Sequence, residues 1–213
     1  MSAYYPAFLD LRDKPVTVIG GGVVAERKVE QLLASGARVT VISPDLTEAL
    51  RAFAGRHAID HLQRAYQPGD LAGSKLAIAA TDDMAANRAA AAEARTLGVW
   101  VNAVDDVKYC DFIAPAVVEQ GDITVAISTG GRSPAIARFL RRQMEAFLSE
   151  DFAALLTIAE DVRARLRREG RTVSPETWQR ALDGGVWPLV SHGRRDEAAA
   201  LLYHNLAGAG VIS

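Results

Sequence analysis

The sequence lacks most of the features that would place it in a membrane or in an oxidising compartment. Cys110 is the single cysteine in 213 residues, which excludes an intrachain disulfide and a cysteine zinc cluster and favours a reducing compartment. No charged segment precedes an apolar stretch at the N-terminus, and no apolar run approaches the length that spans a bilayer. We therefore expect a cytoplasmic protein without membrane contact.

Excess charge of one sign is also lacking. The formal net charge of -2 argues against a general polyanion binder. Arginine is nevertheless concentrated in the second half of the chain, where it is interspersed with acids such as Glu160, Asp161 and Glu169, and we therefore expect no nucleic-acid binding. The arginines of this half are Arg132, Arg138, Arg141, Arg142, Arg163, Arg165, Arg167, Arg168, Arg171, Arg180, Arg194 and Arg195.

The first half of the chain alternates between strand and helix patterns. Short β-branched or apolar runs, typical of buried strands, are separated by stretches with helical spacing of apolar residues. Such alternation predicts an α/β fold, with a Rossmann-like doubly wound parallel sheet. The expected strands are 16–19, 37–43, 75–81 and 99–104, and the expected helices are 24–35, 46–54 and 84–97.

A glycine turn joins the first expected strand to the first expected helix. In VTVIGGGVVAERK, Gly20, Gly22 and Ala25 form a G-x-G-x-x-A pattern. The first glycine permits a tight turn, the second lets the backbone approach a pyrophosphate, and the helix N-terminus supplies amide donors. In this strand-turn-helix context the pattern favours a dinucleotide site over a merely structural turn.

The end of the second expected strand bears on the choice of cofactor. An acidic residue about 20 positions after the glycine turn grips the adenosine ribose in many such domains. Here the strand ends in Ser43, Pro44 and Asp45, so either Asp45 or Ser43 is a candidate for this contact. No arginine follows immediately to hold a 2′-phosphate, and we therefore predict NAD as the cofactor in preference to NADP.

Polar residues stand at the ends of the third and fourth expected strands. Because the carboxyl ends of parallel strands line the ligand crevice, Thr81, Asp82, Asn102 and Asp105 are expected to face the cofactor. A carboxylate beside a nicotinamide can act as a general base, which makes Asp105 the main catalytic candidate. The alternative is that Asp105 and Asp106 only begin a loop. No tyrosine has a lysine four positions later, which excludes the short-chain dehydrogenases.

A further motif, STGGRSP, follows an expected strand at 123–129. Gly130 and Gly131 turn the chain, Ser133 can cap a helix and Pro134 suits its first position. A helix N-terminus beside arginines suits carboxylates, although a solvated basic face explains any single arginine as well. The helix that follows carries an apolar stripe made of Ile136, Phe139, Leu140, Met144 and Phe147.

Two other features are better explained by a structural role than by a metal site or a catalytic nucleophile. His57 and His61 have the spacing of a helical metal pair, but their segment alternates like a surface strand and offers no third ligand nearby. Cys110 has no neighbouring histidine in sequence, and a packed thiol is favoured over a nucleophile. We predict no metal cofactor.

The segments YPAFLDLRDKPVTVIGGGVVAERKVEQLLASGARVTVISPDL, LAIAATDD and NAVDDVKYCDFIAPAVVEQGDITVAISTGGRSPAIARFLRRQ resemble the siroheme synthase precorrin-2 dehydrogenase family, in its short form without a methyltransferase domain. The resemblance runs from Tyr5 to about Leu148 and continues weakly into the tail. It implies NAD-dependent oxidation of precorrin-2 to sirohydrochlorin. In many members it also implies insertion of ferrous iron to give siroheme.

The resemblance implies roles for individual residues. Asp105 becomes the catalytic carboxylate, while Thr129 stands where members commonly have serine near the active site. The cofactor residues are Gly20, Gly22, Val23, Val24, Ser43, Pro44 and Asp45, to which the strand ends add Thr81 and Asp82. The expected residues for the tetrapyrrole substrate are Asn102, Ser128, Thr129, Gly130, Arg132 and Ser133.

The expected organisation has three parts: an NAD-binding domain at 1–112, a dimerisation segment at 113–149 and a helical C-terminal domain at 150–213. The resemblance implies an intertwined homodimer. Two alternatives stay open for the function. One is a dehydrogenase alone, with chelation by a separate protein, and the other is an NAD-sensing module similar to the regulatory domains of potassium uptake systems.

Overall fold

The structure is a computed structural model that describes residues 4–104 and 106–208. The chain divides into two compact units, one reaching Ala114 and including Gly130–Arg132, the other formed by Pro115–Thr129 and the residues from Ser133 onward. No helix in the described ranges is long and apolar enough to cross a bilayer. The first unit contains β1 (Pro15–Ile19), α1 (Val23–Ala34), β2 (Arg38–Ile42), α2 (Glu48–Gly55), β3 (Asp60–Leu62), β4 (Leu76–Ala79), α3 (Met84–Leu97), β5 (Trp100–Ala103) and the 3-10 turn η1 (Val107–Tyr109).

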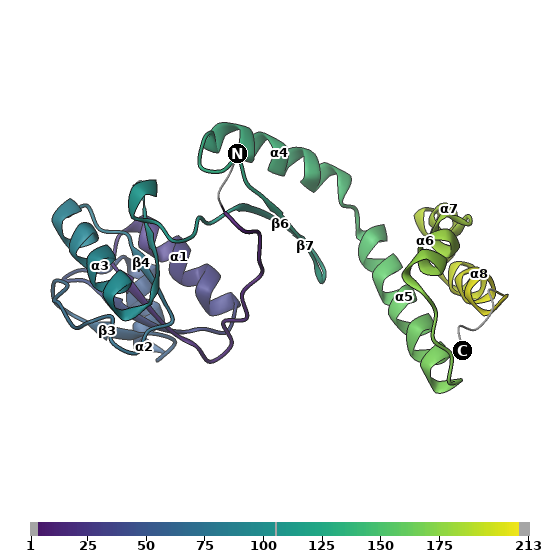
Figure 1. Cartoon of the computed structure of the whole chain (residues 1–213), viewed down its shortest axis with the longest axis horizontal. Helices are drawn as coiled ribbons and strands as arrows, with labels where there is room; N and C mark the ends of the chain where they lie inside the picture. The colour runs from purple at the N-terminus through teal and green to yellow at the C-terminus, as the bar shows by residue number, and fades with distance from the viewer. Residues whose placement is uncertain (1–3, 105, 209–213) are drawn as a thin grey trace. The chain divides into compact units, whose positions relative to one another are not determined.

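A five-stranded parallel sheet in the order β3-β2-β1-β4-β5 forms the centre of the first unit. Figure 1 labels two of its strands, β3 and β4. The chain begins in the middle of the sheet with β1, extends to β3 on one side and returns across β1 to β4 and β5 on the other. This order confirms the predicted Rossmann-like fold. Its reversal point lies between β1 and β4, whose carboxyl ends border the crevice where such sheets bind ligands.

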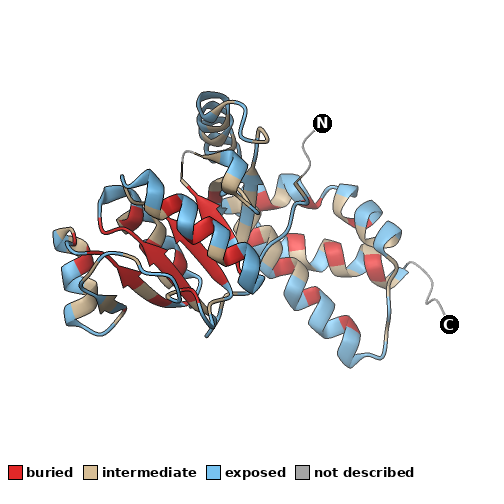
Figure 2. Cartoon of the chain, turned by 60° about the vertical axis from the view of Figure 1, so that its left-hand side comes forward, coloured by how far each residue is buried: buried red, intermediate tan, exposed pale blue. Residues whose placement is uncertain are grey.

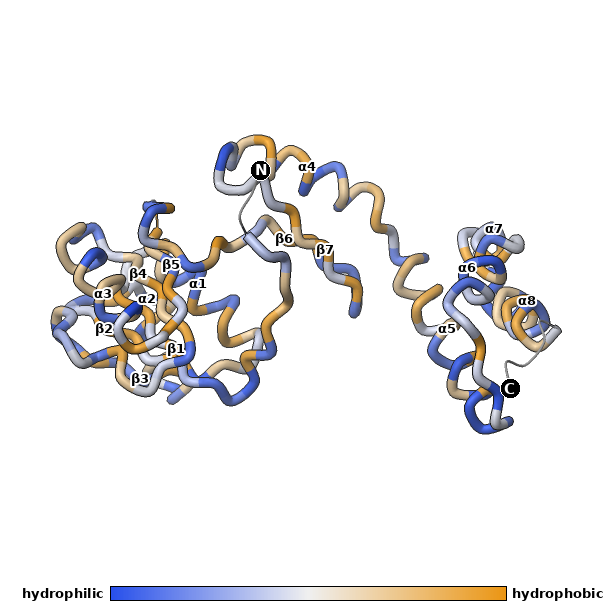
Figure 3. Tube along the Cα trace, in the orientation of Figure 1, coloured by the Kyte–Doolittle hydropathy of each residue, from blue (hydrophilic) through white to orange (hydrophobic). Residues whose placement is uncertain are grey.

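Apolar side chains fill both faces of this sheet. In β4, Leu76 and Ile78 belong to the core shared with α1 and α2, whereas Ala77 and Ala79 belong to the core shared with α3. Successive side chains of a strand point to opposite faces, so helices cover both sides. Figure 2 shows the buried strands between their helices, and Figure 3 shows the same strands as hydrophobic stretches of the chain.

Two helices of this unit, α2 and α3, begin where the side chains of Thr47 and Asp83 cap them. Asp83 accepts hydrogen bonds from the amides of Ala85 and Ala86 at the start of α3, whose bounds match the predicted 84–97. The alternating segment around His57 forms only the short strand β3. His57 itself has a φ of 57° in the turn that follows α2, and the strand therefore cannot begin there.

The second unit combines a hairpin with helices. It contains β6 (Ala116–Gln120), β7 (Ile123–Ile127), α4 (Pro134–Phe147), α5 (Glu150–Arg168), α6 (Pro175–Asp183), α7 (Val186–Ser191) and α8 (Arg195–Gly208). The predicted strand at 123–129 and the predicted tail helices are present. Sequence reasoning missed β6, which holds few β-branched residues, and α7, which is short and contains a proline.

Antiparallel pairing joins β6 and β7 across a turn in which Gly121 has a φ of 57°. The helices α5 to α8 surround a core that includes Val162, Leu166, Val190 and Leu202. Because α4 and α5 both contact β6, residues 115–129 and 133–149 share one compact unit with the helical tail. The division into parts at 1–112, 113–149 and 150–213 stays a prediction about their roles.

Candidate functional site

The turn after β1 depends on Gly20. Its φ is 115°, and a Cβ atom on this residue would lie 2.3 Å from the carbonyl oxygen of Ala80. Any larger residue would thus collide with the backbone that follows β4. The predicted need for glycine at this position has a specific cause, which is the close approach of the β1 and β4 ends.

Gly22 serves a different purpose in the same turn. It precedes the first residue of α1, makes no side-chain cap, and a Cβ atom there would meet nothing within 4 Å. The amides of Val23 and Val24 belong to the first turn of the helix, where backbone donors have no intrahelical acceptor. Open, uncapped helix N-termini of this kind bind anions such as a pyrophosphate in dinucleotide-binding folds. Ala25, fully buried, lets α1 pack closely on the sheet.

Gly21 is the glycine that sequence reasoning left without a role. A Cβ atom there would lie 2.0 Å from the carbonyl oxygen of Asp45. The carbonyl oxygen of Gly21 also accepts a hydrogen bond of 3.0 Å from the amide of Thr47. The loop after β2 therefore packs directly on the glycine turn, which brings the predicted ribose residues beside the predicted pyrophosphate residues.

The structure distinguishes Ser43 from Asp45. The buried Ser43 hydroxyl donates a hydrogen bond of 2.7 Å to the carbonyl oxygen of Asp45 and so shapes the loop. The side chain of Asp45 is exposed beyond Pro44. Of the two candidates for the ribose contact, Asp45 has an exposed carboxylate, whereas the Ser43 hydroxyl is already used in a hydrogen bond within the loop.

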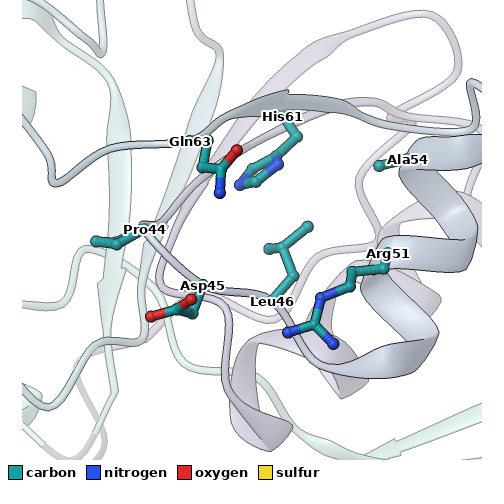
Figure 4. A pocket seen from close by; sticks show the side chains of 7 residues that line it. All are labelled: Pro44, Asp45, Leu46, Arg51, Ala54, His61 and Gln63. Atoms are coloured by element: carbon teal, nitrogen blue, oxygen red, sulfur yellow. The ribbon is translucent and has the colours of Figure 1, made fainter.

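A cavity of about 260 Å³ lies beside this loop (Figure 4). It is lined by Pro44, Asp45, Leu46, Arg51, Ala54, His61 and Gln63. Arg51 comes from α2, so an arginine does reach the tip of β2, although none follows it immediately in sequence. His61 uses its Nε2 atom in a hydrogen bond of 2.9 Å with the carbonyl oxygen of Ser43. In the described ranges no group of histidine, cysteine or acidic residues could hold a metal ion.

The end of β4 is held by Asn87 of α3, another residue that sequence reasoning missed. Its Nδ2 atom donates a hydrogen bond of 2.8 Å to the carbonyl oxygen of Thr81, whose hydroxyl accepts from the amide of Asp83. Asn87 is only 3% exposed, and its Oδ1 atom has no hydrogen-bond partner among the residues that the structure describes. Asp82 is exposed at the same edge. The sequence feature that could have identified this residue is a single asparagine within the alanine-rich stretch of the helix.

The end of β5 carries Asn102, which we predicted to contact the substrate. Its side chain is 8% exposed, and Nδ2 donates a hydrogen bond of 2.9 Å to the carbonyl oxygen of Phe112. The amide nitrogen thus ties the strand to the following loop, because the buried donor requires a partner. Burial raises the pKa of the Cys110 thiol, which hydrogen-bonds to the carbonyl oxygen of Ala103, so it is a packed thiol. Asp105 lies outside the described residues.

The STGGRSP motif is divided between the two units. Gly130, Gly131 and Arg132 belong to the first unit, where a Cβ on Gly131 would contact Val107 of η1 at 3.6 Å. This contact brings the turn at Gly130 and Gly131 to the loop that follows β5. Arg132 is exposed.

Ser128, Thr129 and Ser133 belong to the second unit. Ser133 caps α4 by accepting from the amide of Ile136, and its own amide donates to the Thr129 hydroxyl over 3.1 Å. Thr129 and Ser133 therefore close the loop that precedes α4. The predicted capping by Ser133 is confirmed.

The first unit has a doubly wound parallel sheet, a glycine turn at residues 20–22 after β1, and an uncapped helix that follows it. Together these features define a dinucleotide-binding domain. Comparison with protein families agrees. Residues 7–116 match a family described as "Putative NAD(P)-binding", and residues 120–146 match "Sirohaem biosynthesis protein central". The chain belongs to the first of these families, and a nicotinamide dinucleotide cofactor is confirmed at this level.

Curated relatives extend the likeness over nearly the whole chain. Siroheme synthase from Methylococcus capsulatus is 40% identical over 205 residues, which cover 93% of this chain and 42% of the relative. Siroheme synthase from Thioalkalivibrio sulfidiphilus is 38% identical over 93% of this chain and 41% of the relative. This chain thus spans about two fifths of the length of these relatives, and the family resemblance expected from the sequence is confirmed.

Among solved structures, SirC, described as a precorrin-2 dehydrogenase, matches with a TM-score of 0.75. The match covers 94% of this chain and 100% of SirC at 21% sequence identity. At this identity the match shows a shared fold, which includes the helical second unit.

Proposed function

We propose that this chain oxidises precorrin-2 to sirohydrochlorin with NAD as the oxidant. The observation that carries this proposal is the 40% identity to a siroheme synthase over 93% of the chain, in a protein whose glycine turn is open at Gly22. The tetrapyrrole loses a hydride and a proton in this oxidation. NAD, when bound, supplies the hydride acceptor.

The residues around the glycine turn fit such a cofactor. The amides of Val23 and Val24 would hold the pyrophosphate, and the absence of a Cβ atom on Gly22 leaves room for its oxygens. Asp45 would accept hydrogen bonds from the adenosine ribose. Thr81 and Asp82, at the β4 end beside Gly20, would face the same cofactor, and Asn87 fixes the carbonyl group of Thr81.

The proton of the oxidation requires a base, and we assign this role to Asp105. Its support is the sequence position directly after Val104, whose amide donates to the carbonyl oxygen of Ala79 and so keeps the chain at the carboxyl edge of the sheet. A carboxylate at this edge can take a proton from a bound substrate. Ser128, Thr129, Gly130, Arg132 and Ser133 are the proposed contacts of the tetrapyrrole carboxylates, with Asn102 as a support of the β5 end.

Insertion of ferrous iron into sirohydrochlorin is the second activity that we propose. The curated relatives carry the name siroheme synthase, and siroheme contains iron. In this step Asp105 would accept pyrrole protons as the metal ion, a substrate, enters the ring. A dehydrogenase without chelatase activity is the alternative.

The preference for NAD over NADP rests on Asp45. Its exposed carboxylate would repel a 2′-phosphate, whereas Arg51, which lines the same cavity, would attract one. We expect Asp45→Asn to shift the ratio of NADP to NAD affinity by about tenfold towards NADP. Arg51→Gln in that background should reverse part of the shift, as measured by titration with both dinucleotides.

A second copy of the chain is the proposed partner of α4. This helix has no buried residue, and Phe139 and Phe147 are 50% and 61% exposed. An apolar stripe left open in one chain is a surface for association, and a homodimer would cover it on both copies. The single cysteine is consistent with a reducing compartment, and we propose the cytoplasm.

Incubating the purified protein with precorrin-2 and NAD tests the main proposal. NADH and sirohydrochlorin should form in equal amounts. Protein that binds NAD without forming NADH in the presence of precorrin-2 would support the sensing module and overturn the dehydrogenase. A second incubation, with sirohydrochlorin and ferrous iron, should yield siroheme faster than the uncatalysed control. Failure of this arm alone would leave a dehydrogenase without chelatase activity.

A further inference from the structure

The second unit contains a basic cavity with no part in the proposed oxidation. It has a volume of about 230 Å³ and lies where the end of α5 meets the start of α6. Arg163, Arg167 and Arg171 line it together with Thr172 and the ring of Trp178. None of the described residues that line the cavity is acidic.

The arginines are arranged on one side of α5 and its continuation. Arg163 and Arg167 are four residues apart in the helix, and Arg171 follows four residues later, just beyond the helix end at Arg168. Like charges at this spacing destabilise a helix unless an anion lies between them. Arg165, in contrast, forms an ion pair with Glu169 on the same helix.

Two of the guanidinium groups are held in place by the protein. Arg163 lies over the ring of Trp178, 5.0 Å from its centroid, and this stacking leaves the in-plane N–H groups of Arg163 free. Arg171 donates from one terminal nitrogen to the carbonyl oxygen of Ala207. Such fixed groups lose little further freedom when they bind a ligand.

Arg171 also has a donor that the protein does not satisfy. Its Nε atom is buried and has no hydrogen-bond partner among the described residues. A buried N–H group without an acceptor costs free energy, and such groups are rare in folded proteins. Arg171 also lines the cavity, so a rotation of its side chain on binding would bring this donor to an oxygen atom of the ligand.

We propose that this cavity is a binding site for a small oxyanion, of the phosphate, sulfate or dicarboxylate type. Guanidinium groups donate paired, charge-assisted hydrogen bonds to the oxygens of such groups. The volume suits a compact ion or the charged end of a larger molecule. None of the residues that line the cavity is among the proposed contacts of the cofactor or the tetrapyrrole, and the proposal does not depend on the proposed oxidation.

Titration of the whole protein with sodium phosphate, sulfate or succinate tests this site, with sodium chloride at matched ionic strength as the control. Each oxyanion that binds should raise the thermal unfolding midpoint, because it binds the folded chain only. It should also change the tryptophan fluorescence, since Trp178 lines the cavity. A response to succinate alone would define a carboxylate site, and a response to phosphate and sulfate alone a site for tetrahedral anions.

Arg167→Gln is the test variant, and Arg168→Gln is its matched control. Both residues lie in the last turn of α5 and carry the same charge, but only Arg167 lines the cavity. We expect Arg167→Gln to weaken oxyanion binding by at least about tenfold, with Arg168→Gln close to the unchanged protein. Equal responses to the oxyanions and to chloride, or equal losses in both variants, would show a general effect of charge and overturn the proposal.

Discussion

The two units of this chain differ in how completely they bury their apolar side chains. In the first, fully buried residues such as Val18, Val41 and Val101 fill both faces of the sheet, and the glycine turn leaves room at one position, Gly22. In the second, α5 to α8 enclose a core, while α4 leaves its aromatic residues exposed. The first unit thus carries the proposed cofactor site, whereas the second carries the proposed dimer surface on α4 and the proposed oxyanion site, and these proposals can be tested separately.

The largest effect should come from Asp105, the proposed base of the first unit. Asp105→Ala should lower the turnover of precorrin-2 oxidation by about 10² to 10⁴, the range for loss of a positioned general base. NAD affinity should hardly change, because Asp105 is not among the proposed cofactor contacts. If Asp105 also takes pyrrole protons, iron insertion should fall in parallel. Steady-state kinetics and NAD titration measure these quantities.

Asp106→Ala is the control for this variant, since the neighbouring carboxylate has no assigned role. It should keep most of the activity. Equal losses in both variants would mean that the loop is disturbed as a whole and that the assignment to Asp105 is wrong.

A smaller but still large effect should follow from Gly22→Asp. The added carboxylate would occupy the open space at the start of α1 and repel a pyrophosphate, so NAD affinity should fall by about 100-fold or more. The fold should persist, because a Cβ atom at Gly22 meets no other atom within 4 Å. Calorimetry with NAD and circular dichroism measure the two outcomes.

Gly21→Ala sharpens this experiment within the same turn. Its Cβ atom would lie 2.0 Å from the carbonyl oxygen of Asp45, and the variant should lower the thermal unfolding midpoint. Unchanged NAD binding in Gly22→Asp would remove the cofactor assignment. A fully stable Gly21→Ala protein would contradict the close packing of the β2 loop.

Charge on the apolar stripe of α4 should separate the proposed dimer without unfolding either unit. Phe139→Glu places a charge on the exposed face, and we expect the molecular mass in light scattering to fall to that of one chain at micromolar concentration. Arg138→Gln, one residue away and also exposed, should leave the mass unchanged. A monomeric unmodified protein at this concentration would refute the dimer.

The smallest effect is expected for a set of hydrogen bonds inside the first unit. Glu93 accepts hydrogen bonds from the Tyr66 hydroxyl and from the amides of Gly69 and Leu71, which anchors the segment before β4 to α3. Glu93→Ala should lower the free energy of unfolding by about 1 to 3 kcal/mol, because the partly buried Tyr66 hydroxyl and Leu71 amide lose their acceptor. Denaturant unfolding measures this loss.

Tyr66 makes the stability contributed by its hydrogen bond with Glu93 depend on pH. Burial and the Glu93 carboxylate raise the pKa of Tyr66 in the folded protein. The folded state therefore keeps its proton where the unfolded chain, with an ordinary tyrosine pKa of about 10, loses it. This contribution to stability should be complete below about pH 10 and decline above it. In Tyr66→Phe the alkaline decline should be smaller, and an identical decline in both proteins would contradict this origin.

The sequence by itself determined the elements whose cause is local. The β-branched strands, the cap at Asp83 and the strand-turn-helix pattern around Gly20 and Gly22 were all predictable, because they depend on neighbours within a few residues. The fold class followed from their alternation. The hairpin strand β6 and the short helix α7 were missed because their local preferences are weak.

Only the tertiary structure decided which side chains are free to act. It places Asp45 in the exposed position and uses the Ser43 hydroxyl within the loop. It buries Asn102 against the loop that ends at Phe112, and it brings Arg51 from α2 to the tip of β2. These outcomes depend on contacts between segments that are distant in sequence, where burial and hydrogen-bond partners are set by packing and not by the residue type alone.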